Sequence, residues 1–131
     1  MIFFNTLDPD ILTLTFNGYT DLRTQAYGLD ELISICKKHD RDEHRLCILM
    51  DVRDGATLGA SGRMLTINTL REHRPLFERV LAGWAFVLTS PFNRGVVAAV
   101  GWIARVPFRT ATFATLEEAQ KWCAERLQQK T

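Results

Sequence analysis

The sequence of 131 residues lacks an excess of either charge and lacks a long hydrophobic run. Its 16 Lys and Arg residues nearly balance its 15 Asp and Glu residues, which argues against a broad surface for nucleic acid. Its longest apolar run, Val96–Ile103, is well short of the roughly 20 residues that span a bilayer. The first ten residues carry no basic leader of a secretory signal, so we expect a cytoplasmic protein. From the balanced charge we expect that it binds no nucleic acid.

Paired cysteines are also missing. Cys36, Cys47 and Cys123 form no Cys-x-x-Cys pair and leave an odd count, which speaks against both a disulfide framework and a zinc site. Each falls in a segment with apolar periodicity, where cysteine packs as a small hydrophobic residue. We therefore expect three reduced, structural thiols.

The histidines do not form a metal motif. Two of the three, His39 and His44, border a charged run that also contains Asp40 and Glu43. Nothing in the spacing fixes these side chains in a common geometry, so a solvated loop is favoured over a metal centre. We expect neither a metal nor another cofactor.

What the sequence does contain is an alternation of strand and helix patterns. A short hairpin precedes three successive units in which an apolar or amphipathic helix leads to another strand, and a helix closes the chain. This order predicts a single-domain α/β sandwich over residues 1–131, with a mixed, mostly parallel sheet of about five strands and four helices. The expected strands are Ile2–Phe4, Ile11–Phe16, Leu46–Val52, Val80–Leu88 and Phe108–Phe113.

The expected helices have recognisable ends. Thr20 is a candidate cap for the first helix, which ends in Lys37, Lys38 and His39. The second begins near Ser61-Gly62 and should stop before Pro75, because the residue preceding proline disfavours helical angles. The last begins at Thr115-Leu-Glu-Glu118, a capping box in which the hydroxyl and the carboxylate exchange bonds with first-turn N–H groups.

One polar pocket is predicted where the central strand stops at Asp51 and a helix begins near Ser61-Gly62. In open α/β sheets ligands bind at this place, since free backbone N–H groups and the positive helix end converge there. Asp51 is also a common type of turn residue, and Arg53 has the alternative of pairing with Asp51 or Asp54 to fix the loop. Both alternatives remain open.

The helix between Arg94 and Arg105 has little polar face, because Val96, Val97, Val100, Trp102 and Ile103 recur along it. Such a helix is either packed deep in the core or covers a ligand cavity, a partner or a membrane surface. Core packing is the favoured interpretation. A partner surface should expose the Trp102 helix, whereas a ligand site should fold it over a cavity.

Asp51, Ser61-Gly62 and the terminal FATLEEAQKW together resemble the SpoIIAA-like proteins of the STAS superfamily, over nearly the whole chain. In anti-sigma factor antagonists of that superfamily an Asp-Ser-Ser-Gly motif opens the helix after the central strand. Its Asp falls here on Gly59 and its phosphorylated first Ser on Ala60. The resemblance thus implies a STAS-type fold without the usual phosphoacceptor, and leaves Ser61 as a modification candidate.

The SpoIIAA-like branch also resembles the CRAL-TRIO lipid-binding fold, which implies an apolar or lipid-like ligand beneath a mobile helix at residues 94–108. Our main hypothesis is therefore a non-catalytic domain that binds a small amphiphilic ligand, with peripheral membrane contact as an extension. Its ligand-binding candidates are a polar rim and an apolar wall, namely Asp51, Arg53, Ser61, Gly62, Ser90, Arg94 and Trp102.

The alternative hypothesis is a regulatory domain that docks a protein partner or a second copy through the same surface. An enzyme is less favoured, and we assign no catalytic residue. A receiver-type phosphoacceptor at Asp51 would need an acidic pair for magnesium and a lysine that the sequence does not supply. A phosphatase-like Asp-x-Asp is broken because Arg53 occupies its second acidic position.

Overall fold

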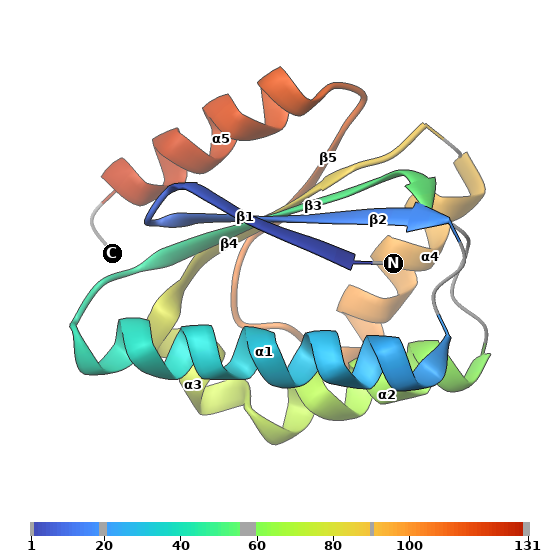
Figure 1. Cartoon of the computed structure of the whole chain (residues 1–131), viewed down its shortest axis with the longest axis horizontal. Helices are drawn as coiled ribbons and strands as arrows, with labels where there is room; N and C mark the ends of the chain where they lie inside the picture. The colour runs from blue at the N-terminus through green and yellow to red at the C-terminus, as the bar shows by residue number, and fades with distance from the viewer. Residues whose placement is uncertain (1, 19–20, 56–59, 90, 130–131) are drawn as a thin grey trace.

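The structure is a computed structural model that describes residues 2–18, 21–55, 60–89 and 91–129, with the backbone alone for 2–8, 17–18, 54–55, 91–94, 96 and 100. Over these residues it contains five strands and five helices (Figure 1). In chain order they are β1 (Ile2–Asp8), β2 (Ile11–Gly18), α1 (Leu22–Arg41), β3 (Leu46–Gly55), α2 (Ala60–Glu72), α3 (Arg74–Val80), β4 (Leu81–Val87), α4 (Pro91–Ala104), β5 (Thr110–Phe113) and α5 (Leu116–Gln128).

The strands form one sheet in the order β1-β2-β3-β4-β5. β1 and β2 are antiparallel, with Phe4 opposite Leu14, and form the expected hairpin. β2, β3, β4 and β5 run parallel to one another. The prediction of a mixed, mostly parallel sheet is thereby confirmed. At the far edge, Thr110 and Thr112 of β5 face solvent, as expected for an edge strand.

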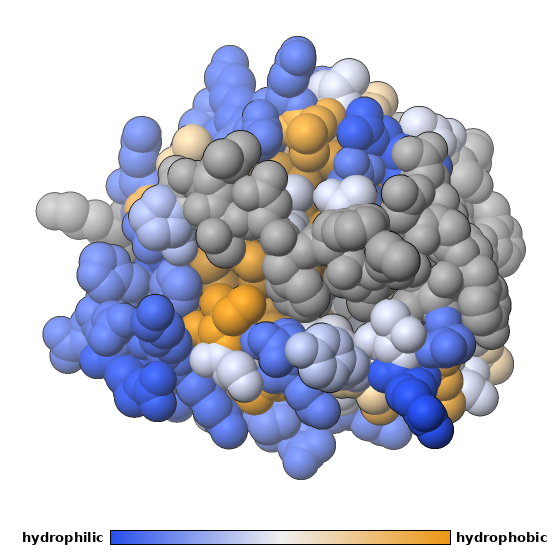
Figure 2. Space-filling view, viewed as in Figure 1, coloured by the Kyte–Doolittle hydropathy of each residue, from blue (hydrophilic) through white to orange (hydrophobic). Residues whose placement is uncertain are grey.

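Two layers of helix cover the sheet unequally. Connections between adjacent parallel strands are right-handed, so helices that follow β2, β3 and β4 in turn fall on the same face. α1, α2, α3 and α4 lie on that face, and α5 lies alone on the other (Figure 1). Figure 2 shows charged and polar side chains over α1, with a hydrophobic strip between this helix and the sheet edge.

The larger part of the core lies beneath α1, α2 and α3. Leu32 and Cys36 of α1 meet Leu12 and Ile48 of the sheet there, together with Phe77 of α3. The smaller cluster on the other face contains Cys47, Leu49, Ala85 and Val87, with Ala119 and Cys123 of α5. All three cysteines are buried free thiols, as their positions in apolar segments predict.

The described residues form five helices, one more than the four expected. α2 ends at Glu72, and a separate helix, α3, begins at Arg74 with Pro75 in its first turn. Proline suits this place because first-turn N–H groups have no partner within the helix and its φ is already helical. Pro75 therefore begins a helix here, whereas the sequence interpretation used it only to end one.

Several element ends also differ from the prediction. The cap of α1 is Asp21, whose carboxylate accepts from the Thr24 backbone N–H at 2.7 Å, and Thr20 lies outside the described residues. α1 continues through Arg41, beyond the expected end at His39. β3 continues to Gly55, so Asp51 does not end the strand. Asp51 is instead the last β3 residue that pairs with β4, opposite Val87.

The capping box of α5 is present in a modified form. The Glu118 backbone N–H donates to the Thr115 hydroxyl oxygen at 3.3 Å, as predicted. The Glu118 carboxylate accepts from that hydroxyl at 2.8 Å, and this contact takes the place of the expected bond to the Thr115 backbone N–H. Both contacts fix the start of α5, and Glu117 and Glu118 complement the positive end of the helix.

Candidate functional site

Asp51 is a buried carboxylate held by its own strand. It is 8% exposed, and it accepts from Arg53 through Nε at 2.9 Å and through a terminal guanidinium nitrogen at 2.8 Å. The Arg53 backbone N–H also donates to it at 3.2 Å. These bonds, led by the guanidinium contact, hold the pKa of Asp51 below its ordinary value although burial opposes the shift. The pairing alternative for Arg53 is thus the arrangement that the structure shows.

This pair limits what Asp51 can do chemically. A carboxylate with a lowered pKa is ionised at neutral pH, so it is a poor general acid. Its two oxygens are both engaged by one guanidinium in a bidentate pair. The arrangement fixes the conformation of β3 at the place where β3 stops pairing with β4.

Ser61 and Gly62 lie in the first turn of α2, Ser61 exposed and Gly62 buried. None of the described contacts joins Gly62 to the Asp51 side chain. Its carbonyl accepts from the Gln25 side chain at 2.8 Å, and the same Gln25 nitrogen lies 2.8 Å from the Thr66 hydroxyl. A Cβ at Gly62 would lie 2.5 Å from the Gln25 side-chain oxygen. Gly62 therefore allows α2 to approach α1 closely.

Gln25 is the polar residue that the sequence interpretation missed. It is buried between α1 and α2, and its side chain joins the two helices. Its position on the apolar side of α1, four residues before Leu29, was a usable signal, because a buried amide needs hydrogen-bond partners. The remaining candidates are less informative: Ser90 lies outside the described residues, and only the backbone of Arg94 is described, in the first turn of α4.

Trp102 lies near the C-terminal end of α4 and is 83% exposed, and Ile103 beside it is 45% exposed. The favoured interpretation of this helix as deeply packed core is therefore wrong for these residues. Exposure continues along one side of α4 at helical spacing, and we call this side the α4 outer face. Among the α4 residues whose exposure is described, it consists of Gly95, Ala98, Ala99, Trp102 and Ile103.

Other residues of α4 whose side chains the structure describes are covered: Ala104 is buried, and Val97 and Gly101 are half-buried. α4 packs against α2. Trp102 lies about 12 Å along the helix axis from Arg94, at 1.5 Å per residue. The structure therefore does not place Trp102 beside the start of α4, where Arg94 lies.

Two arginines from neighbouring helices hold the end of α4. Arg71 of α2 donates to the Ile103 carbonyl at 3.0 Å, and Arg74 of α3 donates to the Arg105 carbonyl. Arg105 has a φ of 52°, and its N–H bonds the Trp102 carbonyl while the Val106 N–H bonds the Gly101 carbonyl. This pattern is a Schellman motif, which usually has glycine at the left-handed position.

An aromatic stack lies in the core on the side of the sheet that faces these helices. Trp84 of β4 stacks on Phe86 and on Phe108, with ring centroids 5.8 Å apart in each case. Its indole Nε1 is buried, and no hydrogen-bond partner for it occurs in the described part of the chain. A buried N–H donor of this kind usually has an acceptor, so this atom is an unexplained polar group among the described side chains of the core.

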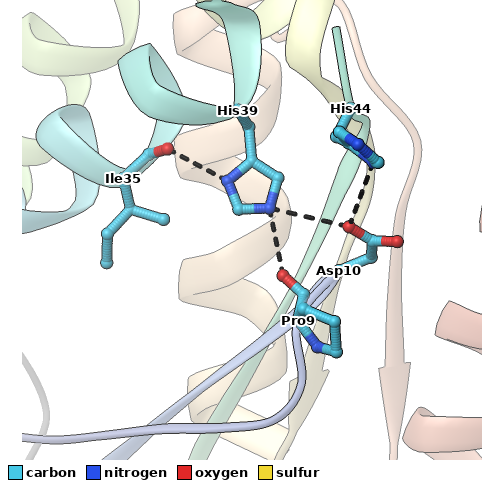
Figure 3. Close-up of polar contacts among 5 residues, drawn as sticks. All are labelled: Pro9, Asp10, Ile35, His39 and His44. Carbon is cyan, nitrogen blue, oxygen red and sulfur yellow. Dashed lines mark hydrogen bonds and ion pairs between the residues drawn. The ribbon is translucent and has the colours of Figure 1, made fainter. Parts of the chain in front are cut away.

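His39 and His44 lie by the turn between β1 and β2, close to Asp10 (Figure 3). This turn is at the end of the sheet opposite to Asp51. The two ring nitrogens of His39 lie 3.1 Å from the Ile35 carbonyl and 3.0 Å from the Pro9 carbonyl. Asp10 Oδ1 lies 3.7 Å from His39 Nε2 and 3.9 Å from His44 Nδ1. These contacts join α1 to the hairpin turn.

Asp40, which borders His39 in the charged run, forms a different contact. Asp40 pairs with Arg79 of α3 at 3.1 Å, which lowers the pKa of Asp40 through the guanidinium hydrogen bonds. No group of three or more His, Cys, Asp or Glu side chains among the described residues is arranged to hold a metal ion. A bilayer-crossing helix, long and apolar enough to span, is likewise missing from the described ranges.

Comparison with known proteins gives a likeness of fold. No protein-family model matches the sequence, and no curated protein matches it. An uncharacterised protein of the DUF3478 family with a SpoIIAA-like fold, from Shewanella loihica PV-4, is 12% identical with a TM-score of 0.67, over 94% of this chain and 92% of that one. The Bacillus cell fate determinant SpoIIAA, in its phosphorylated form, is 17% identical with a TM-score of 0.58, over 93% and 98%.

These matches confirm the predicted fold. The chain has a SpoIIAA-like fold over nearly its whole length, as the resemblance of its motifs implied.

Proposed function

We propose that this chain is a regulatory, non-catalytic domain that binds a protein partner through the α4 outer face. The observation that carries the proposal is the 83% exposure of Trp102. Burying such a side chain at an interface contributes strongly to affinity, and Trp is enriched among the residues that dominate binding energy. A helix that covered a ligand cavity would turn this residue inward.

The SpoIIAA-like fold supports the proposal without naming a partner. The phosphorylated SpoIIAA structure shows that one protein of this fold carries a phosphate. By the motif alignment, the phosphorylated serine corresponds here to Ala60, which has no hydroxyl. We therefore infer that partner binding by this chain is not switched by phosphorylation at that position.

The arrangement of Asp51 supports a binding role over a catalytic one. Both of its oxygens are engaged by the Arg53 guanidinium. A phosphoacceptor would need a free carboxylate oxygen and bound magnesium. We propose that the Asp51–Arg53 pair shapes this end of the sheet and takes no part in a reaction.

The test is native mass spectrometry of the full chain, tagged and purified gently from its source cells. We expect a complex with a defined protein in wild type and its loss in Trp102→Asp. Tyr27→Asp is the matched control, because Tyr27 is an aromatic residue on α1 with 65% exposure. Circular dichroism and the melting temperature of both variants should remain close to wild type, since neither side chain is in the core.

Two results would overturn this proposal. One is a wild-type chain that carries no protein under conditions that preserve known weak complexes. The other is a complex that survives Trp102→Asp and Tyr27→Asp equally.

A second candidate function is the binding of a small amphiphilic ligand, which the unpartnered Nε1 of Trp84 favours. A ligand oxygen in the helical layer would satisfy this donor. Organic extraction of the purified protein, followed by mass spectrometry, tests the idea directly. A stoichiometric amphiphile that is lost in Trp84→Phe supports it, and an extract that contains no such compound rejects it.

A further inference from the structure

We propose that the partner segment bound by the α4 outer face is an acidic amphipathic helix. This inference rests on the proposed function and adds the chemistry of the partner. It depends on two properties of the surface that are independent of each other, its charge and its shape.

Three arginines lie at the C-terminal end of α4, near Trp102. Arg71, Arg74 and Arg105 are exposed, and the first two reach the backbone at the end of α4. None of the three forms an ion pair with a carboxylate in the described ranges. The sequence has no acidic residue between Glu78 and Glu117, a segment that includes all of α4. A partner with carboxylates beside its apolar contact would therefore meet complementary charge.

The shape of the surface fits a helix. Gly95, Ala98 and Ala99 recur at helical spacing and have little or no side chain, and a Cβ built at Gly95 meets no atom within 4 Å. Small residues at such spacing let a second helix approach closely, at the short end of the usual interaxial distance of about 8–10 Å. Trp102 and Ile103 lie at one end of this face and provide its large apolar side chains.

Other occupants fit less well. A second copy in a two-fold arrangement would bring its own Arg71, Arg74 and Arg105 toward this surface, and like charges at an interface are unfavourable. Membrane-binding helices combine basic residues with a broad face of bulky apolar side chains. Three of the five residues of the α4 outer face are glycine or alanine, which offer a bilayer little to insert.

The experiment is site-specific photo-crosslinking of the full chain in its source cells. p-Benzoylphenylalanine replaces Ile103, so that Trp102 stays in place, and in a control chain it replaces Tyr27 on α1. Crosslinked peptides are sequenced by mass spectrometry. We expect the Ile103 position to capture one protein segment in which apolar residues recur every three or four positions and Asp or Glu outnumber Lys and Arg.

The outcomes separate the two proposals. A single captured protein whose segment is neutral or basic overturns the acidic-helix inference and leaves the proposed function standing. Crosslinks to lipid, to nucleic acid or to a second copy overturn both the acidic-helix inference and the proposed binding of a protein partner. The same follows if position 103 captures nothing beyond the Tyr27 control.

A charge variant tests the same inference on the captured segment as a synthetic peptide. Arg105→Gln should weaken its binding about threefold to tenfold, whereas Arg41→Gln, an exposed arginine at the end of α1, should leave it unchanged. Raising salt should weaken wild-type binding because it screens exposed charges. Equal affinity of wild type and both variants at low and high salt would contradict the role of charge.

Discussion

At the scale of single residues, the most informative group is the Asp51–Arg53 pair. It joins a buried carboxylate to a guanidinium that is only partly covered, with side-chain exposures of 11% and 39%. Such a pair contributes more than a surface ion pair, because the buried carboxylate would otherwise keep only the bond from the Arg53 backbone N–H. The sequence brought these two residues together as candidates, but it did not show that each would satisfy the other.

The lowered pKa of Asp51 leads to a prediction about pH. Because its folded pKa lies below the ordinary 3.8, the pair stabilises the fold at neutral pH, and this contribution is lost as pH falls through the lowered pKa. Asp51→Asn should reduce the unfolding free energy by about 2 kcal/mol at pH 7. In urea titrations the difference from wild type should shrink below pH 4 and disappear once the pH is below the lowered pKa.

Asp40→Asn provides the control, since Asp40 forms an exposed pair with Arg79 and should give a smaller change at pH 7. A difference between wild type and Asp51→Asn that stays constant from pH 7 to pH 2 would contradict our assignment of the stabilisation to the ionised carboxylate.

The three thiols should be inert in the folded protein. Burial raises the pKa of Cys36 to about 12, and contact with the Cys123 thiol, followed by burial, raises the pKa of Cys47. Thiolates are the reactive form, so a disulfide reagent such as DTNB should modify no cysteine at pH 8 on a timescale of minutes. All three should react in denaturant. Rapid modification of the native chain would show that α5 opens readily.

At the scale of elements, the contact between α1 and α2 depends on the missing side chain of Gly62. Gly62→Ala places a Cβ against the buried Gln25 amide, and we expect a loss of about 1–3 kcal/mol. Gly95→Ala is the matched control, because Gly95 is exposed in α4 and meets no atom within 4 Å. It should stabilise by about 0.5–1 kcal/mol, since alanine is the better helix former.

Denaturation in urea measures both variants. If Gly62→Ala stabilises the protein as much as Gly95→Ala does, then Gln25 moves aside easily and does not fix the helix pair.

Element ends separate what the sequence predicts from what tertiary contacts decide. The buried strand beginning at Leu46 and the capped helix beginning at Thr115 are predicted well, because continuous apolar runs and capping residues are local signals. α3 was missed because Pro75 was interpreted only as a helix breaker. The end of α4 could not be predicted, since a positive φ at Arg105 is held by Arg71 and Arg74 from distant segments.

The candidate site was predicted less well than the fold. Apolar composition placed α4 in the core, yet periodicity cannot tell which apolar face of a helix meets protein and which remains open. Asp51 was assigned to a strand end, but β3 continues because β2 extends beside it, with Gly18 opposite Gly55. Both errors concern neighbours that lie far away in the sequence.

At the scale of the whole molecule, α5 is held against the sheet by a close contact between Gly83 of β4 and Trp122. A Cβ at Gly83 would lie 2.6 Å from the Trp122 ring, which also packs on Phe113. Gly83→Ala should therefore destabilise the protein by about 1–3 kcal/mol. Trp122→Leu in that background should cost less than in wild type, by at least about 0.5 kcal/mol.

A double-mutant cycle in urea measures this coupling. Combining Trp122→Leu with Gly62→Ala is the control, because Gly62 lies in the helical layer on the other face and the two effects should add. Additive effects in the Gly83 cycle as well would mean that α5 shifts freely over the sheet.

The order of the strands in space is the same as their order along the chain. Each new strand adds to the edge left by the preceding one, so no strand has to insert between two that are already paired. The parallel pairs nevertheless join residues far apart in the sequence, such as Ile11 with Cys47 and Leu46 with Leu81, and such pairing is associated with slower folding than local contacts. During synthesis, the growing sheet can still accept each strand as it leaves the ribosome, and α5 covers the remaining face as the last helix to emerge.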